Sequence, residues 1–206
     1  MKKTMGSILT LVLICLAGWG IAADKLIPAG TTSENLKAAY IGENNTRARY
    51  EAFAVKADEE GYAGAASLFR AVAQAEKIHA ANHSRVIKAL GFAALGDVEK
   101  PVVKATKENL AWVVKEENRE YNIMYPDYLR KAVKDKNQQA VTSFKDAMEA
   151  EHSHLSLFSQ AAAELEGCKL KKSFLVCHTC GYTTGNFNIK KCPACAQPRV
   201  SFKIYD

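Results

Sequence analysis

Proline, glycine and long apolar runs are scarce in this sequence. Five prolines and 12 glycines among 206 residues exclude a collagen-like chain. Because only one apolar run, near the N-terminus, is long enough to cross a bilayer, a multi-pass membrane protein is excluded as well. A hydrophobic content of 48% with 8 Tyr, 8 Phe and 2 Trp also excludes long disordered stretches. The composition is that of a globular chain with one domain, or with one domain and a small module.

Acidic residues are nearly missing from the C-terminal end. Residues 168–206 carry seven Lys or Arg and one acid, Asp206, whereas residues 24–167 carry 19 basic and 21 acidic residues. The net charge therefore changes from −2 to +6 at this boundary, which indicates two modules. We predict one domain over residues 24–167 and a smaller one over residues 168–206.

Charge is also absent from Thr4 to Ala23, a run of 20 residues that follows Lys2 and Lys3. Small residues at the end of this run, among them Gly20 and Ala22, fit a signal peptidase site. We expect residues 1–23 to be an export signal and the mature protein to lie in the bacterial periplasm. The alternative is a retained membrane anchor, since 20 uncharged residues are long enough to span a bilayer.

No cysteine occurs between Leu16 and Gly167. A cleaved signal would take Cys15 with it and leave five cysteines in an oxidising compartment, an odd number that argues against simple disulfide pairing. Cys168 lies apart from the other four, and we expect it to be a free thiol without a role.

The last four cysteines form two Cys-x-x-Cys knuckles, Cys177 with Cys180 and Cys192 with Cys195. Two knuckles supply the four thiolates of a tetrahedral metal site, and a module this small needs its metal to fold. Structural zinc and two disulfides are the alternatives to iron, because tetrahedral sulfur sites suit both metals. Gly181 after one knuckle and Pro193 inside the other resemble rubredoxin, which holds a redox-active iron.

The region from Ser33 to Glu166 has the periodicity of four long helices. A breaker-rich stretch from Gly91 to Pro101 separates the second helix from the third, and it must carry the chain across the bundle. One long crossover is the wiring of ferritin-like bundles. The predicted fold class is therefore mainly α, a ferritin-like four-helix bundle followed by a small rubredoxin-like four-cysteine metal-binding β module.

Each predicted apolar seam is interrupted by acidic residues, which are costly in a core unless they are paired or bind metal. Three i, i+3 pairs project two polar side chains from one helix face, and a single glutamate comes from the first helix. Such a set suits a carboxylate-bridged di-iron or di-manganese centre; the alternative is a bundle with acidic faces and chance histidine neighbours. The candidate ligands are Glu43, Glu76, His79, Glu117, Glu120, Glu151 and His154.

Two histidines leave a choice open. Glu149 and His152 form an overlapping Glu-x-x-His match, but periodicity places Glu151 on the apolar seam and predicts that Glu149 and His152 are solvated. His83 lies one turn beyond His79 on the same side of its helix. It is either a further ligand or a histidine hydrogen-bonded beside the ligands.

Over nearly all of residues 31–206 the chain resembles the rubrerythrin family. Departures are Glu116, where the family usually has Gly, and the export signal. The matching motifs, in order, are Asn35-Leu36, Gly42-Glu43, Glu76-x-x-His79-Ala80, Glu108-Asn109-Leu110, Glu117-x-x-Glu120-Tyr121, Met124-Tyr125-Pro126, Glu151-x-x-His154 and the two knuckles.

The resemblance implies a role for each ligand. Glu76 and Glu151 would bridge two irons, and Glu120 and His79 would alternate on one iron, the carboxylate when it is oxidised and the imidazole when it is reduced. Terminal ligands would be Glu43, Glu117 and His154. Tyr50 and Tyr125 stand at family-matching offsets and would hydrogen-bond ligand carboxylates; plain aromatic packing is the alternative.

The same resemblance implies a peroxidase that reduces hydrogen peroxide to water, with electrons passed from the four-cysteine iron to the di-iron centre. The expected partners are hydrogen peroxide, a protein electron donor with an acidic face to meet the basic module, and a second copy in a head-to-tail homodimer; no nucleic acid is expected. The alternatives are a ferroxidase or iron-storage protein, and a zinc-containing redox sensor or scaffold.

Overall fold

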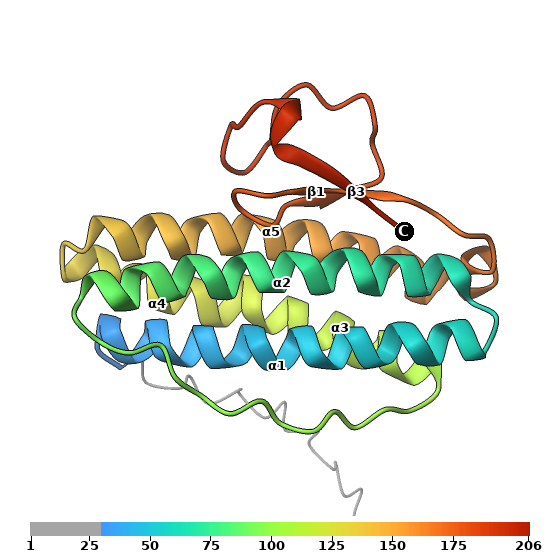
Figure 1. Ribbon diagram of the computed structural model, residues 1–206, viewed down its shortest axis with the longest axis horizontal. Helices are drawn as coiled ribbons and strands as arrows, with labels where there is room; N and C mark the ends of the chain where they lie inside the picture. The colour runs from blue at the N-terminus through green and yellow to red at the C-terminus, as the bar shows by residue number, and fades with distance from the viewer. Residues whose placement is uncertain (1–29) are drawn as a thin grey trace, which may run out of the picture.

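The computed structural model describes residues 30–206 (Figure 1). The predicted export signal at residues 1–23 lies outside the described residues. Within residues 30–206, no helix combines the length and the apolar character needed to cross a membrane.

Four helical segments form the bundle, each antiparallel to the segments it packs against; they are called rods because the third is not one continuous helix. The first two are α1 (Thr32–Glu59) and α2 (Ala63–Ala89), joined by a tight turn at Gly61, whose φ of 80° suits glycine. A capping box starts α1, since the Thr31 side chain accepts from the Glu34 N–H and the Glu34 carboxylate accepts from the Thr31 N–H. The fourth rod is α5 (Gln138–Ala163), capped by the Asn137 side chain.

The third rod is interrupted, whereas the sequence predicted one continuous helix. It consists of α3 (Thr106–Arg119), a π-helical turn η1 (Glu120–Met124) and α4 (Tyr125–Lys134). Pro126, at the start of α4, lacks the N–H that would continue the α-helical hydrogen-bond pattern. The π-helical turn just before it accommodates the missing donor. The π turn begins at Glu120, one of the candidate ligands.

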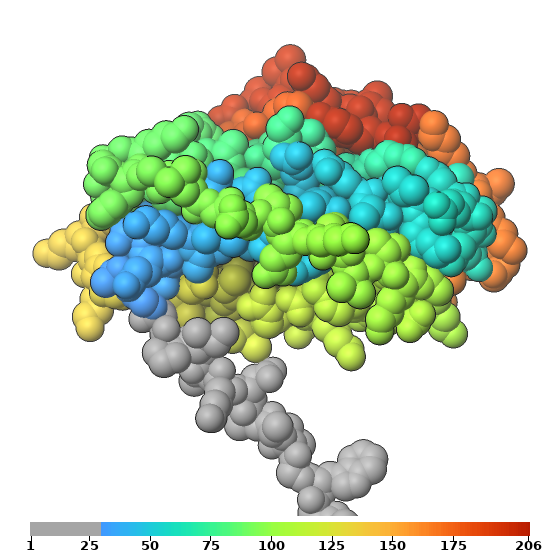
Figure 2. Space-filling model, turned by 60° about the horizontal axis from the view of Figure 1, so that its bottom comes forward, coloured from blue at the N-terminus to red at the C-terminus, as the bar shows by residue number. Residues whose placement is uncertain are grey.

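The predicted crossover is confirmed. Residues 90–105 run as an extended segment along the outside of α1 (Figure 2) and return the chain to the end where α3 begins. The Glu99 N–H donates to Asn45 Oδ1 at 2.8 Å, and the Glu99 carboxylate pairs with Arg49 at 2.9 Å. These contacts attach the crossover to α1 and confirm the ferritin-like wiring.

Two apolar clusters occupy the two ends of the bundle. One is built on Tyr50, Phe69 and Phe158, and the other on Leu36 and Phe144 together with their neighbours. The candidate carboxylates lie between these clusters at the middle of the helices. Water is therefore kept from the polar centre along the length of the bundle.

The C-terminal module is a small antiparallel sheet of order β2-β1-β3, which confirms the predicted mainly α fold with a small β module. It follows η2 (Leu165–Cys168) and contains β1 (Phe174–Cys177), β2 (Thr183–Thr184), η3 (Arg199–Ser201) and β3 (Phe202–Tyr205). The module lies against α2 and α5 of the same chain (Figure 1). Alternate side chains of β1 divide between two cores, since Phe174 and Val176 join the bundle core while Leu175 packs around the cysteines.

Candidate metal centres

All seven candidate carboxylate and imidazole ligands lie in the core of the bundle. Their side chains come from α1, α2, the α3–η1 rod and α5, and each residue is at most 5% exposed. Glu116, which departs from the family pattern, is directed outward and pairs with Arg119 at 3.1 Å. The substitution therefore leaves the neighbouring Glu117 in place.

Six of the seven residues form two overlapping groups. Ligand atoms of Glu43, Glu76, His79 and Glu151 lie within 4.8 Å of one another, and so do those of Glu76, Glu117, Glu151 and His154. Glu76 and Glu151 belong to both groups. This is the geometry of two neighbouring cation sites that share two carboxylates.

Several carboxylate oxygens at this centre have no hydrogen-bond partner among the described residues. They are buried oxygens of Glu43, Glu76 and Glu117, and Glu151 Oε1 lies 3.0 Å from His79 Nδ1 without the alignment of a hydrogen bond. Burial raises the pKa of Glu76 well above its ordinary value, with the Glu151 charge adding to it, and raises the pKa of Glu117 to about 7. Burying several carboxylate oxygens without hydrogen-bond partners destabilises the fold. Cations ligated by these oxygens would offset that free-energy cost.

The two histidines each face the carboxylates through Nδ1. His79 Nδ1 lies 2.9 Å from Glu76, and His154 Nδ1 lies 2.7 Å from Glu151. Although burial opposes the charged form, the Glu151 carboxylate raises the pKa of both imidazoles well above the ordinary value. Each Nε2 is left facing away from the centre, toward the C-terminal module.

Glu120 lies just outside both groups. It is 5% exposed, and its carboxylate lies 3.7 Å from the Arg119 guanidinium. Burial raises its pKa well above the ordinary value, and the Glu43 charge adds to this shift. Glu120, the first residue of the π turn, is thus a further buried carboxylate outside the two groups.

Both predicted tyrosines hydrogen-bond the carboxylates. The Tyr50 hydroxyl donates to Glu117 Oε1 at 2.5 Å, and the Tyr125 hydroxyl donates to Glu43 Oε1. Each hydroxyl leaves the second oxygen of its carboxylate free for a cation and fixes the orientation of the group. The aromatic rings also pack in the core, so the two interpretations given by the sequence both apply.

His83 and His152 both contact residues other than the candidate ligands. His83 belongs to neither ligand group; its Nδ1 lies 2.8 Å from Ser143 Oγ, and its Nε2 lies 3.1 Å from the Tyr125 hydroxyl. His152 is exposed and stacks on Tyr121 with ring centroids 4.7 Å apart. Glu151 is buried as the periodicity predicted and belongs to both groups, whereas Glu149, predicted to be solvated, is half-buried.

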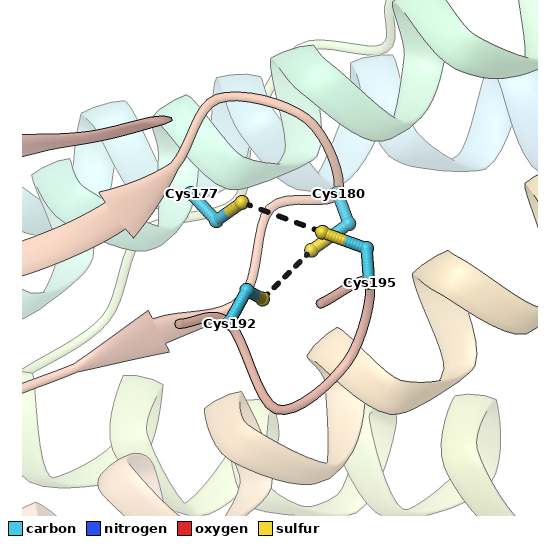
Figure 3. A group of neighbouring side chains, drawn as sticks. All are labelled: Cys177, Cys180, Cys192 and Cys195. Carbon is cyan, nitrogen blue, oxygen red and sulfur yellow. Dashed lines mark hydrogen bonds between the residues drawn. The ribbon is translucent and has the colours of Figure 1, made fainter. Parts of the chain in front are cut away.

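The four knuckle cysteines meet at one point (Figure 3). Cys177 Sγ lies 3.7 Å from Cys195 Sγ, and Cys180 Sγ lies 3.5 Å from Cys192 Sγ, with no disulfide among them. A tetrahedral site with metal–sulfur bonds of about 2.3 Å places its sulfurs about 3.8 Å apart. Cys168 is buried away from this cluster, and burial raises the pKa of its thiol.

The first knuckle is packed directly on the ligand histidines. His79 Nε2 lies 2.9 Å from the Cys180 carbonyl oxygen, and His154 Nε2 lies 3.2 Å from the Gly181 carbonyl oxygen. Gly181 has a φ of 84°, and a Cβ at this position would come within 2.3 Å of His79 Nε2. The sequence marked Gly181 as part of a knuckle, but no signal in the sequence indicated that it lies on His79.

The family model for rubrerythrin matches residues 34–162, which include every carboxylate and histidine of the bundle centre. The chain belongs to the rubrerythrin family. Nigerythrin from Nitratidesulfovibrio vulgaris is 35% identical over 91% of this chain and 93% of its own length, and rubrerythrin-2 from Clostridium acetobutylicum is 33% identical over 84% and 96%. The structure of fully reduced, all-ferrous nigerythrin aligns with a TM-score of 0.83 over 99% of this chain and 100% of that chain, at 32% identity.

Membership of the rubrerythrin family sets the cofactors. The carboxylate and histidine cluster fits the di-iron centre of the family, and the four-cysteine cluster fits its rubredoxin-like iron. The bundle fold is wider than the family, since a Desulfovibrio desulfuricans bacterioferritin aligns with a TM-score of 0.55 at 20% identity. What separates the rubrerythrin architecture from a bundle alone is the cysteine module on α2 and α5.

Proposed function

We propose that this chain is a peroxidase that reduces hydrogen peroxide to two molecules of water with two electrons and two protons. The observation that carries the proposal is the contact between the first knuckle and the ligand histidines. A bundle that only oxidised or stored iron would have no use for a thiolate metal site hydrogen-bonded to its own ligands. A di-iron centre, when bound, supplies both electrons together, and the four-thiolate site has no open position for peroxide.

The two ligand groups suggest how the residues are used. We propose that Glu76 and Glu151 bridge the metals, that Glu43 and Glu117 are terminal ligands, and that His154 completes the Glu117 side. On the Glu43 side, His79 and Glu120 both lie within the buried cluster. A ferric ion favours an anionic ligand and a ferrous ion accepts a neutral imidazole, so the pair is suited to alternate as the charge of the metal changes.

The surrounding side chains have separable tasks in this proposal. Tyr50 and Tyr125 hold one oxygen of Glu117 and of Glu43, respectively, and so orient the two carboxylates. The two apolar clusters exclude water, which strengthens the electrostatic interactions at the centre. His79 and His154 join the centre to the backbone of the first knuckle, which is the direct route for electrons from the cysteine site.

Support for redox use comes from a relative. Nigerythrin has been solved in fully reduced, partially reduced and mixed-valence states. The decisive experiment on this chain is its metal content and absorption spectrum, followed by peroxide consumption with a reductant. We expect about three irons per chain, a thiolate-to-iron absorption band and consumption of peroxide. Zinc in the knuckles with no such band supports a sensor or scaffold, and iron uptake without peroxide consumption supports a ferroxidase.

We further propose that the electron donor is a protein with an acidic face. Lys190 and Lys191 beside the second knuckle are exposed and form no salt bridge with any described residue, whereas Lys169 pairs with Glu166. Two unpaired cations next to the cysteine site attract an anionic surface and raise the encounter rate more than the affinity.

Reversing these two charges is expected to slow reduction of the cysteine iron by an acidic electron-transfer protein. The effect of Lys190→Glu with Lys191→Glu should shrink as salt rises, because the Debye length falls from about 10 Å at 0.1 M to about 3 Å at 1 M. Lys107→Glu with Lys115→Glu, on the exposed face of α3, is the matched control. Equal rates for both double variants at low salt would leave these lysines a role in solubility alone.

We also propose where the protein is located and whether it needs a second copy for electron transfer. Export by residues 1–23 would place the peroxidase in the periplasm, where it meets peroxide before the cytoplasm does; a retained anchor would hold it at the membrane. The resemblance implied electron transfer between the subunits of a head-to-tail homodimer, but here the knuckle contacts the histidines of its own chain. We therefore propose that each chain contains a complete route, whether or not two chains associate.

A further inference from the structure

A pocket of about 490 Å³ opens on the side of the bundle between α2, α5 and the first knuckle. Its lining includes Asn82, Arg85, Ser143 and Asp146. These four side chains are polar and can hydrogen-bond water that enters the pocket. Ser143 is only 6% exposed and is the point at which the pocket meets the buried interior.

A continuous line of hydrogen bonds runs inward from Ser143. Ser143 Oγ lies 2.8 Å from His83 Nδ1, and His83 Nε2 lies 3.1 Å from the Tyr125 hydroxyl. The Tyr125 hydroxyl in turn donates to Glu43 Oε1. His83 and Tyr125 are fully buried, so this line crosses the apolar cluster around Phe144 to reach the carboxylate centre.

The hydrogen bond from Tyr125 to Glu43 determines which atom donates and which accepts in each of the other hydrogen bonds of this line. Tyr125 has one hydroxyl hydrogen, and it is given to Glu43; the hydroxyl oxygen must therefore accept from His83 Nε2–H. His83 Nδ1 is then the acceptor, and Ser143 is its donor. His83 therefore has one donor, Nε2–H, and one acceptor, Nδ1, which is the hydrogen-bonding pattern of a neutral imidazole.

We propose that Ser143, His83 and Tyr125 form a relay that carries protons from the pocket to Glu43 at the carboxylate centre. The inference rests on the proposed peroxide reduction, which consumes two protons for each peroxide. In one transfer, a hydronium ion or buffer acid in the pocket protonates Ser143 Oγ as Ser143 passes its hydrogen to His83 Nδ1. His83 passes its Nε2 hydrogen to Tyr125, and Tyr125 passes its own to Glu43. One proton enters and one is delivered, and only O–H and N–H bonds change. The transfer leaves the ring hydrogen on Nδ1, so the His83 ring must rotate about its Cβ–Cγ bond, and the Tyr125 hydroxyl about its C–O bond, before the next transfer.

The other tyrosine shows that the line is not required merely to hold a carboxylate. Tyr50 donates to Glu117 in the same way, yet its ring is packed against Phe53, Phe69 and Phe158. Its hydroxyl has no further hydrogen-bond partner in residues 30–206. A tyrosine in an apolar cluster is therefore enough for orientation, and the polar pair of Ser143 and His83 behind Tyr125 serves another purpose. These residues are positioning residues, since none of them lies in either ligand group.

The first test uses the iron-loaded full chain and follows a single turnover of the reduced centre with peroxide in H₂O and in D₂O. Ser143→Ala is expected to lower the rate by about a hundredfold, the lower end of the range for assisted proton transfer, and to enlarge the solvent isotope effect. Ser143→Thr, which keeps the hydroxyl, should restore most of the rate. Thr142→Ala is the matched control, because Thr142 lines the same pocket and donates only to the Gln138 carbonyl.

A second test separates proton transfer from packing. In His83→Gly, added imidazole should restore turnover, whereas 1-methylimidazole should not, because it fills the cavity without an N–H to donate. Equal rescue by both compounds would mean that His83 only fills space and would overturn the relay.

A third readout does not depend on turnover. In ¹⁵N-histidine spectra of the zinc-loaded chain, His83 should be neutral near pH 7 with its hydrogen on Nε2. A hydrogen on Nδ1, or a doubly protonated ring, would overturn the assigned direction. If the unaltered chain consumes no peroxide, the proposed function fails; if it does and Ser143→Ala reacts at the same rate, the relay alone fails.

Discussion

Replacing Glu76 with alanine is expected to remove both irons from the bundle and abolish peroxide reduction, while the four-cysteine iron remains. Glu76 belongs to both ligand groups and is completely buried, so its loss deprives each cation of a shared carboxylate. The knuckles bind their metal with separate residues. Iron content should fall from about three to about one per chain, with the thiolate absorption band retained.

Two further variants make this result interpretable. Glu149→Ala is the control. Glu149 is the glutamate of the second Glu-x-x-His match on α5 and lies outside both ligand groups, so this variant should retain about three irons per chain. Glu76→Gln keeps the size of the side chain and should also lose the bundle iron, because a neutral amide is a weak substitute for a bridging carboxylate. Retained bundle iron and peroxide reduction in both Glu76 variants would disprove the bridging role.

Replacing Gly181 with alanine is expected to slow the transfer of electrons from the cysteine iron to the bundle by about a hundredfold, because a small displacement of a reacting group has effects of this size. The added Cβ would lie 2.3 Å from His79 Nε2, so the knuckle must move away from the histidine. Both metal centres should stay occupied. The measurement is the rate at which the bundle iron is reduced after rapid reduction of the thiolate iron.

Backbone strain at Gly181 needs its own control, because a φ of 84° is unfavourable for alanine in any surroundings. Gly61 has a φ of 80° and no atom within 4 Å of a Cβ at its position, so Gly61→Ala introduces strain alone. Gly185→Ala adds a Cβ to the C-terminal module that contacts nothing. If Gly61→Ala slows the transfer as much as Gly181→Ala does, the contact with His79 is not the route.

Mixing two inactive variants distinguishes a route within one chain from a route between subunits. Glu76→Ala chains would keep the thiolate iron, and Cys180→Ser chains would keep the bundle iron. Because the knuckle contacts the histidines of its own chain, we expect no peroxide reduction from the mixture. Recovery of activity would show transfer between the subunits of a dimer.

The sequence by itself determined the parts of this protein that depend on short spacings. An i, i+3 pair such as Glu76 with His79 must share one helix face, and seam periodicity was enough to choose Glu151 over Glu149. Two Cys-x-x-Cys knuckles specify a four-sulfur site wherever the module lies, and the long second connection specifies the crossover. These features follow from local geometry, which the order of residues sets directly.

Only the tertiary structure decided the contacts between residues far apart in the chain. The packing of the helices and the module decides four features: the π turn at Glu120, which carboxylate Tyr125 hydrogen-bonds, the line from Ser143 through His83, and the contact of Gly181 with His79. No local propensity encodes such contacts, because His79 and Cys180 lie 101 residues apart and meet only when burial of apolar faces brings α2 and the module together. The candidate ligands of each metal centre could therefore be predicted from the sequence. The contact between the two centres arises from packing.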